Sequence, residues 1–448
     1  MKIKLITLGC AKNLVDSEVI AGGLQANGVQ FTDEADAQDA IIINTCGFID
    51  SAKEESIETI LGAVSLKNQG KCARVIVTGC LSERYGDELK KEIPEIDGLY
   101  GNRDLKKIVR DIAQQLDLKS ELLGERQLLS PKHYAYLKIS EGCEHPCTFC
   151  AIPGIRGNFR SQPIEKLVRE ANLLAEQGVR ELVLIAQDTT VYGMDYYGEK
   201  KLPALLRALN KVDGIEWLRL MYAYPYHVTD ELIETIASSE KVCKYVDMPV
   251  QHVSSKMLKR MARRMNGEKQ HRLIEKMRAA IPDFALRTSV IVGFPGETDE
   301  DFTELYDYVS DGWFDRLGVF TYSQEDGTPA ATFPDQVPVE VMRNRQDMLI
   351  QAQDETQSYK NQQLIGKKLM VLIDEYDRDE QVFRARTAWD CPEIDQNVLI
   401  REACQVGAFY DVEIEASGMH DLTAKILNKS KGKALNWMST QLPLISVT

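Results

Sequence analysis

Residues 141–150 read Glu-Gly-Cys-Glu-His-Pro-Cys-Thr-Phe-Cys, and this stretch decides how the whole chain is interpreted. Its three cysteines, Cys143, Cys147 and Cys150, have a Cys-x3-Cys-x2-Cys spacing and directly follow a predicted strand. Three thiolates on a four-iron cube leave one iron open, to which a substrate can coordinate. The spacing therefore predicts an open 4Fe–4S site. A zinc site with His145 as its fourth ligand, or cysteines with a purely structural role, are the alternatives.

From residue 134 onward the chain alternates between apolar runs and helical segments such as 163–176. The candidate strands cover residues 136–140, 181–187, 217–222, 245–250, 286–292 and 316–322. Because each strand is followed by a helix, the expected sheet is parallel, with its chemistry at the C-terminal strand ends. Six such units predict a partial, TIM-like (β/α)6 barrel in an α/β protein.

A shorter pattern occurs three times ahead of this loop. The apolar runs 4–10, 40–46 and 74–80 each end in a cysteine, namely Cys10, Cys46 and Cys80. Each run is β-branched and leads into a helical segment, which predicts an open parallel sheet of the flavodoxin-like kind. The three cysteines would share its C-terminal edge, where helix N-termini favour an anionic cluster. Three buried cysteines of an ordinary Rossmann-like sheet are the alternative.

The C-terminal part of the sequence has a different pattern of predicted helices and strands. A long polar helix is expected at 338–362, and five short candidate strands follow it, at 368–374, 382–387, 397–401, 410–416 and 423–427. These strands predict a small antiparallel barrel. Residues 366–429 contain eight Lys or Arg and thirteen Asp or Glu, a net charge of −5. Such a barrel is poorly suited to binding RNA phosphates and better suited to a basic protein partner.

Composition places the chain among ordinary globular proteins. It has 448 residues, of which 44% are hydrophobic and 27% charged, with a formal net charge of −14. At about 150 residues per domain, three domains are expected. No apolar run is long enough to span a membrane or to act as a signal peptide, so a cytoplasmic location is expected. In that reducing compartment the ten cysteines favour ligand or redox roles over disulfides.

The cysteine-rich loop resembles the signature of the radical S-adenosylmethionine (SAM) superfamily. In that superfamily the open iron chelates SAM, and a reducing electron cleaves SAM to methionine and a 5′-deoxyadenosyl radical. The resemblance implies that Phe149 lies beside the adenine. Residues 288–297 resemble the strand segment that lies against the adenosine, which makes Val292 a second candidate for binding SAM. Gln187 is a third.

Further segments resemble the radical SAM methylthiotransferase family. They are residues 8–18, 44–48, 78–81, 150–157 and 186–190. The resemblance implies a second 4Fe–4S cluster on the N-terminal cysteines and a second SAM as methyl donor. It divides the chain into an N-terminal methylthiotransferase domain (1–125), a radical SAM domain (132–365), a TRAM domain (366–432) and a tail (433–448).

Two branches of this family modify either a tRNA adenosine or an aspartate of ribosomal protein S-twelve. Residues 11–13, 47–51 and 187–190 look like the aspartate branch, and the acidic barrel agrees with it. We therefore expect a methylthio group to be added to the β-carbon of an aspartate in that small-subunit protein, with an electron donor as a further partner. A tRNA methylthiotransferase is the nearest alternative. A non-catalytic iron–sulfur scaffold protein is an alternative from another class.

Several arginine, histidine and cysteine residues lie outside the two groups of three cysteines. Arg156 and Arg160 could contact a carboxylate substrate or SAM, although solvated arginines fit the sequence equally well. His252 is expected to be an ordinary hydrogen-bonded histidine. The remaining cysteines, Cys72, Cys243, Cys391 and Cys404, are expected to have no ligand role.

Overall fold

The computed structural model describes residues 1–32, 38–118 and 126–430. Its N-terminal unit is a five-stranded parallel sheet in the order β2-β1-β3-β4-β5. The strands are β1 (Lys2–Thr7), β2 (Gln30–Phe31), β3 (Ala40–Thr45), β4 (Val75–Gly79) and β5 (Gly98–Leu99). The helices are α1 (Ala11–Gln25), α2 (Asp50–Asn68), α3 (Cys80–Glu92) and α4 (Leu105–Gln115). This strand order confirms the predicted flavodoxin-like sheet.

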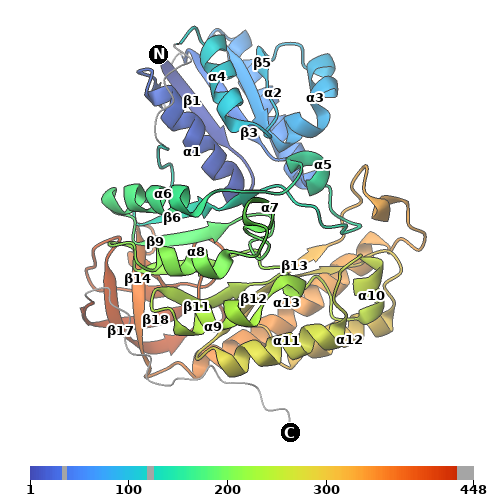
Figure 1. The fold of residues 1–448 in the computed structure, drawn as a ribbon, viewed down its shortest axis with the longest axis vertical. Coiled ribbons are helices and arrows are strands. Elements are labelled where there is room, and N and C mark those ends of the chain that lie inside the picture. Colours follow the sequence, from blue (N-terminus) through green and yellow to red (C-terminus); the bar gives the residue numbers. More distant parts are fainter. Residues whose placement is uncertain (33–37, 119–125, 431–448) are drawn as a thin grey trace.

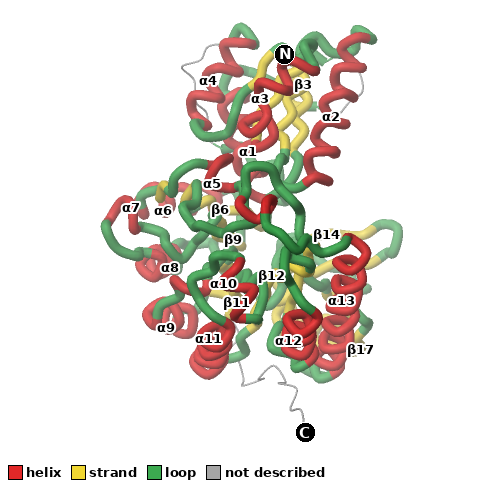
Figure 2. Tube along the Cα trace, turned by 90° about the vertical axis from the view of Figure 1, so that its right-hand side faces the viewer, coloured by secondary structure: helices red, strands yellow, loops and turns green. Residues whose placement is uncertain are grey.

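Alternation along β3 explains why helices cover both faces of this sheet. Ile41 and Ile43 point to one face and pack with α2 and α3, while Ile42 points to the other and packs with α1 and α4. Successive side chains of a strand face opposite ways, so a strand of consecutive isoleucines needs apolar cover on both sides. Figure 2 shows the resulting three layers above the rest of the molecule.

The central unit is an open six-stranded sheet in the order β13-β12-β11-β10-β9-β6, with every pair parallel. The strands are β6 (Tyr134–Lys138), β9 (Glu181–Ile185), β10 (Trp217–Leu220), β11 (Val242–Asp247), β12 (Ala285–Val292) and β13 (Arg316–Thr321). The outer helices are α6 (Ile164–Glu176), α8 (Leu202–Leu209), α9 (Asp230–Ser238), α10 (Ser255–Arg260), α11 (Gly267–Ala280), α12 (Asp299–Ser310) and α13 (Val339–Gln362). The predicted (β/α)6 architecture is confirmed.

Smaller elements lie at the strand ends of this unit. They are β7 (Ser140–Glu141), α5 (Ile152–Arg156), β8 (Arg160–Ser161), α7 (Met194–Tyr197), η1 (Pro225–His227) and η2 (Pro329–Thr332). No helix of the described residues is long and apolar enough to cross a membrane.

The C-terminal unit is a closed five-stranded barrel in the order β14-β15-β16-β18-β17. Its strands are β14 (Lys368–Asp377), β15 (Val382–Thr387), β16 (Val398–Ile400), β17 (Phe409–Ser417) and β18 (Leu422–Lys429). The small barrel was predicted, but β16 and β18 pair in parallel, so it is not wholly antiparallel. The predicted domain boundaries stay predictions, and the predicted tail lies outside the described residues.

This small barrel packs against the six-stranded sheet beside the N-terminal ends of its strands (Figure 1). Trp217 of β10 meets Phe409 of β17 edge-on, with ring centroids 4.9 Å apart. Beside them, Glu181 of β9 lies between Arg219 of β10 and Arg386 of β15, at 2.7 and 2.8 Å, and all three side chains are almost fully buried. The small barrel therefore covers the N-terminal ends of these strands, and a buried ion network connects the two units.

We predict that E181Q lowers the free energy of unfolding by about 3–5 kcal/mol, because it leaves two buried guanidinium groups without their shared carboxylate. Denaturant unfolding of the full chain measures the change. E231Q is the control, because it breaks an exposed ion pair with Arg207 and should cost less than about 1 kcal/mol. Equal effects of the two variants would contradict this account.

Candidate functional site

Cys10, Cys46 and Cys80 lie together at the C-terminal edge of the N-terminal sheet. They follow the three adjacent strands β1, β3 and β4, whose ends are in register. Cys10 caps the N-terminus of α1, and Cys80 is the first residue of α3. The topology thus brings together residues that are widely separated in the sequence, as the repeated pattern predicts.

The three thiols influence one another's ionisation. Burial raises the pKa of Cys80 to about 11; the like charges of Cys10 and Cys46 act in the same direction, while Arg156 opposes them. Burial also opposes ionisation of Cys10, but Lys12, Arg156 and N–H groups of the first turn of α1 outweigh it and lower its pKa. Three thiolates in one place repel each other unless a cation binds them, which is the donor chemistry that a metal cluster needs.

Glycines beside these cysteines leave space for such a group. Gly9 has φ +87°, and a Cβ there would lie 2.7 Å from Cys46 Cβ and 2.9 Å from its Sγ. A Cβ on Gly47 would lie 2.7 Å from the Cα of Leu81. Side chains at these positions would force the strand ends apart, so the close approach depends on glycine. The donor set and this open cradle fit an iron–sulfur cluster.

The second trio, Cys143, Cys147 and Cys150, occupies the loop between β7 and α5. Hydrogen bonds fold the loop back on the barrel: Cys143 N donates to Gly157 O at 3.1 Å, and Cys150 N donates to Cys147 O at 3.2 Å. Burial raises the pKa of Cys143 to about 11 and that of Cys150 to about 12, and the charge of Cys147 adds to both shifts. Arg263 Nη1 donates to Cys147 Sγ at 3.7 Å. These three sulfurs also form one donor group.

The residues expected to bind SAM lie at the strand ends near this loop. Phe149 packs edge-on against Phe294, with ring centroids 6.4 Å apart, and Val292 is fully buried at the end of β12. Gln187 Nε2 donates to Glu141 Oε1 at 2.7 Å. Its Oε1 is buried and has no hydrogen-bond partner among the described residues, so it offers an acceptor to a bound group.

His145 is held by a partner that sequence reasoning left unassigned. Its Nε2 donates to Asp188 Oδ2 at 2.6 Å, and its ring stacks on Tyr224 with centroids 4.1 Å apart. The Thr190 backbone N–H in turn donates to Asp188 at 2.7 Å. Asp188 thus holds His145 in place, and His145 belongs to the cysteine loop. The only signal in the sequence was that Asp188 lies in the 186–190 segment.

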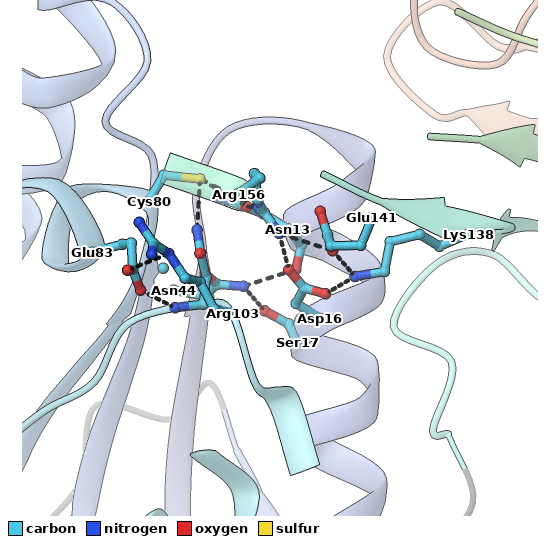
Figure 3. Close-up of polar contacts among 12 residues, drawn as sticks. Asn13, Asp16, Ser17, Asn44, Cys80, Glu83, Arg103, Lys138, Glu141 and Arg156 are labelled. Carbon is cyan, nitrogen blue, oxygen red and sulfur yellow. Dashed lines mark hydrogen bonds and ion pairs between the residues drawn. The ribbon is translucent and has the colours of Figure 1, made fainter. Parts of the chain in front are cut away.

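Arg156 links Cys80 of the N-terminal trio to Glu141, which lies two residues before Cys143, and sequence reasoning did not foresee this contact (Figure 3). It is 2% exposed, so it is neither solvated nor a free substrate contact. Its Nη2 donates to Cys80 Sγ at 3.3 Å and to Asn13 Oδ1, while Nη1 donates to Asp16 at 2.7 Å and Glu141 at 3.3 Å. A hydrogen-bonded chain therefore runs from the N-terminal sheet to the barrel.

Lys138 completes this network. Its ammonium donates to Glu141 at 2.6 Å and also contacts Asp16. Although burial opposes the charged form, Lys138 and Arg156 lower the pKa of Glu141 to about 2. Two buried cations are thus matched by two buried carboxylates, so the network can stay ionised away from water.

Arg160, His252 and the four remaining cysteines lie outside the two cysteine trios and the network of Arg156. Arg160 is exposed and donates to the carbonyl oxygen of Arg103 at 2.8 Å. His252 is buried and accepts hydrogen bonds from the N–H groups of Val253 and Ser254, as expected of an ordinary histidine. Of the remaining cysteines, three are buried and one is partly exposed, and all are free: Cys72, Cys243, Cys391 and Cys404.

Comparison with known proteins agrees with this geometry. Residues 2–101 match the uncharacterized protein family UPF0004, residues 137–309 the radical SAM superfamily, and residues 365–427 the TRAM domain. The methyltransferase TsrM from Kitasatospora setae superposes with a TM-score of 0.54 at 14% identity, covering 73% of this chain and 76% of TsrM. OxsB superposes with a TM-score of 0.50 at 12% identity, covering 78% of this chain and 56% of OxsB. Fold and site define a radical SAM protein, a class that uses SAM and a 4Fe–4S cluster.

Full-length relatives identify the family. The ribosomal protein uS12 methylthiotransferases RimO of Christiangramia forsetii and Chloroherpeton thalassium are 46% and 45% identical to this chain. The alignments cover 96% of both chains in the first case, and 95% of this chain and 98% of the relative in the second. The chain belongs to the RimO methylthiotransferase family.

We predict that R156Q lowers the free energy of unfolding of the metal-free protein by about 3–5 kcal/mol, because Asp16 and Glu141 lose a buried cation. R156K should recover part of this loss, since it restores the charge but not the planar fork of donors. The matched control is the exposed Arg160, for which R160Q should change stability by about 0.5 kcal/mol or less. A loss in R156Q no larger than that in R160Q would show that Arg156 does not hold the two units together.

Proposed function

We propose that this chain adds a methylthio group to the β-carbon of an aspartate in small-subunit ribosomal protein uS12. The observation that carries the proposal is the pair of cysteine trios, joined through the buried Arg156 and borne by facing units of the fold. An aspartyl β-C–H bond is inert toward side-chain bases, so its replacement requires cofactor chemistry, with the protein supplying position and exclusion of water.

In this proposal each trio holds one 4Fe–4S cluster. Cys143, Cys147 and Cys150 would hold the SAM-binding cluster, and Cys10, Cys46 and Cys80 would hold the auxiliary one. When bound, these groups supply hydrogen-atom removal from an unactivated carbon, together with the sulfur and methyl groups that are transferred. The glycines beside Cys46 and the absence of disulfides among these six thiols support this assignment.

The residues of the chain bind and orient the cofactor. Phe149 would pack against the adenine from the loop, and Val292 would form the apolar wall beside the adenosine. The buried Oε1 of Gln187 would accept a hydrogen bond from SAM, while its Nε2 stays on Glu141. The ion pair of Glu141 with Lys138 keeps that carboxylate charged and in place.

The fold also supports the choice of partner and of compartment. The small C-terminal barrel has a net charge of −5 over residues 366–429, which favours a basic ribosomal protein and disfavours tRNA. Free thiols and cluster ligands suit the reducing cytoplasm, where an electron donor would reduce the SAM-binding cluster.

We predict that the anaerobically reconstituted, reduced protein converts uS12 to a product heavier by one SCH3 in place of one hydrogen. C143A should form neither this product nor 5′-deoxyadenosine. C46A should not form the methylthio product, because sulfur delivery needs the auxiliary site. Mass spectrometry of uS12 and of the small-molecule fraction measures both. C404S serves as the control, because Cys404 is remote from both trios. Modification of tRNA in place of uS12 would contradict the proposed substrate.

A further inference from the structure

We propose that the ammonium group of Lys12 binds the side-chain carboxylate of the substrate aspartate. The inference rests on the proposed function and deepens it by naming the residue that selects an anionic side chain. It is carried by a cation without a carboxylate partner that lies where the N-terminal unit meets the barrel.

Lys12 is a half-buried residue in the first turn of α1, close to Cys10. Its Nζ lies 3.4 Å from the centre of the Tyr222 ring. Among the described residues, no carboxylate forms an ion pair with Lys12. A half-buried ammonium without a carboxylate partner has a desolvation cost, which an incoming carboxylate would offset.

Three nearby cations, Lys138, Arg156 and Arg287, have carboxylate partners, whereas Arg263 donates to Cys147 Sγ and to the carbonyl oxygen of Pro249. Lys138 and Arg156 share Asp16 and Glu141. Arg287 of β12 pairs with Asp247 at 2.8 Å and with Asp395 at 3.4 Å. These ion pairs are therefore structural, and Lys12 differs from them in having a charge left for a ligand.

The backbone of Tyr222, whose ring contacts the ammonium group of Lys12, is in the left-handed region. Its φ is +57°, a left-handed value that a bulky residue rarely adopts. The conformation is maintained by Asp247, which accepts from Tyr222 N at 3.2 Å, and by Thr189, whose N donates to Tyr222 O at 3.1 Å. Strain of this kind persists where the surroundings enforce it and often marks a functional site. The ring contacts the ammonium from one side, which leaves other N–H donors free.

The position of Lys12 suits the proposed reaction. Tyr222 follows β10 at the C-terminal strand ends of the barrel, and Cys10 belongs to the N-terminal trio. A carboxylate on Lys12 would therefore lie between the two units. The β-carbon of an aspartate is bonded directly to its carboxylate carbon, so fixing the carboxylate also fixes the carbon that reacts. An adenosine has no such group.

The test is a double-mutant cycle with the reconstituted full chain. Wild type, K12M and K12Q are each titrated with uS12 and with uS12 whose target aspartate is replaced by asparagine. K90M is the matched control on an exposed lysine. We expect wild type and K90M to bind the aspartate form about tenfold or more tightly than the asparagine form. Both Lys12 variants should bind the two forms equally, with iron content unchanged.

Each outcome is decisive. If K12M and K12Q keep the preference for aspartate, Lys12 does not bind the carboxylate, while product formation by wild type would leave the proposed function intact. If both variants lose iron, Lys12 supports the cluster instead, and the proposal is wrong. If wild type neither binds nor modifies uS12, the proposed function fails, and this inference fails with it.

Discussion

One buried guanidinium group, that of Arg156, sets the relation between the two cysteine trios. It donates to Cys80 at the start of α3, to Asp16 on α1 and to Glu141 of β7. These partners belong to two units with separate apolar cores. Because each partner is itself buried, losing the guanidinium would leave carboxylates without a counter-ion, a state that is much costlier than a lost surface ion pair.

A second ion cluster attaches the N-terminal unit on the opposite side. Glu325, just after β13, accepts from Arg84 of α3 at 2.7 Å and from Lys53 of α2 at 3.1 Å, and its side chain is 3% exposed. Strands β6 and β13 are the two edges of the open six-stranded sheet. The network of Arg156 lies near the β6 edge and that of Glu325 near the β13 edge. The N-terminal unit therefore spans the C-terminal ends of the barrel strands and is attached at both edges.

The sequence predicted the parts of this arrangement that depend on local pattern. Strand–cysteine–helix repeats placed Cys10, Cys46 and Cys80 on one sheet edge, and the β-branched runs identified the long strands. The two-residue strands β2 and β5 are too short to give a periodic signal. The roles of Arg156 and Asp188 depend on tertiary contacts: Arg156 meets Asp16, which is 140 residues away in the chain. Composition and spacing contain no information about such docking.

The central claim is that each of two separate trios holds an iron cube, and the iron and sulfide content of an anaerobic preparation tests it most directly. We predict about eight irons and eight sulfides per chain for the wild type, and about four of each for the C10A/C46A/C80A variant. About four irons in the wild type, all lost in C143A, would contradict the claim, because the N-terminal trio would then hold no cluster.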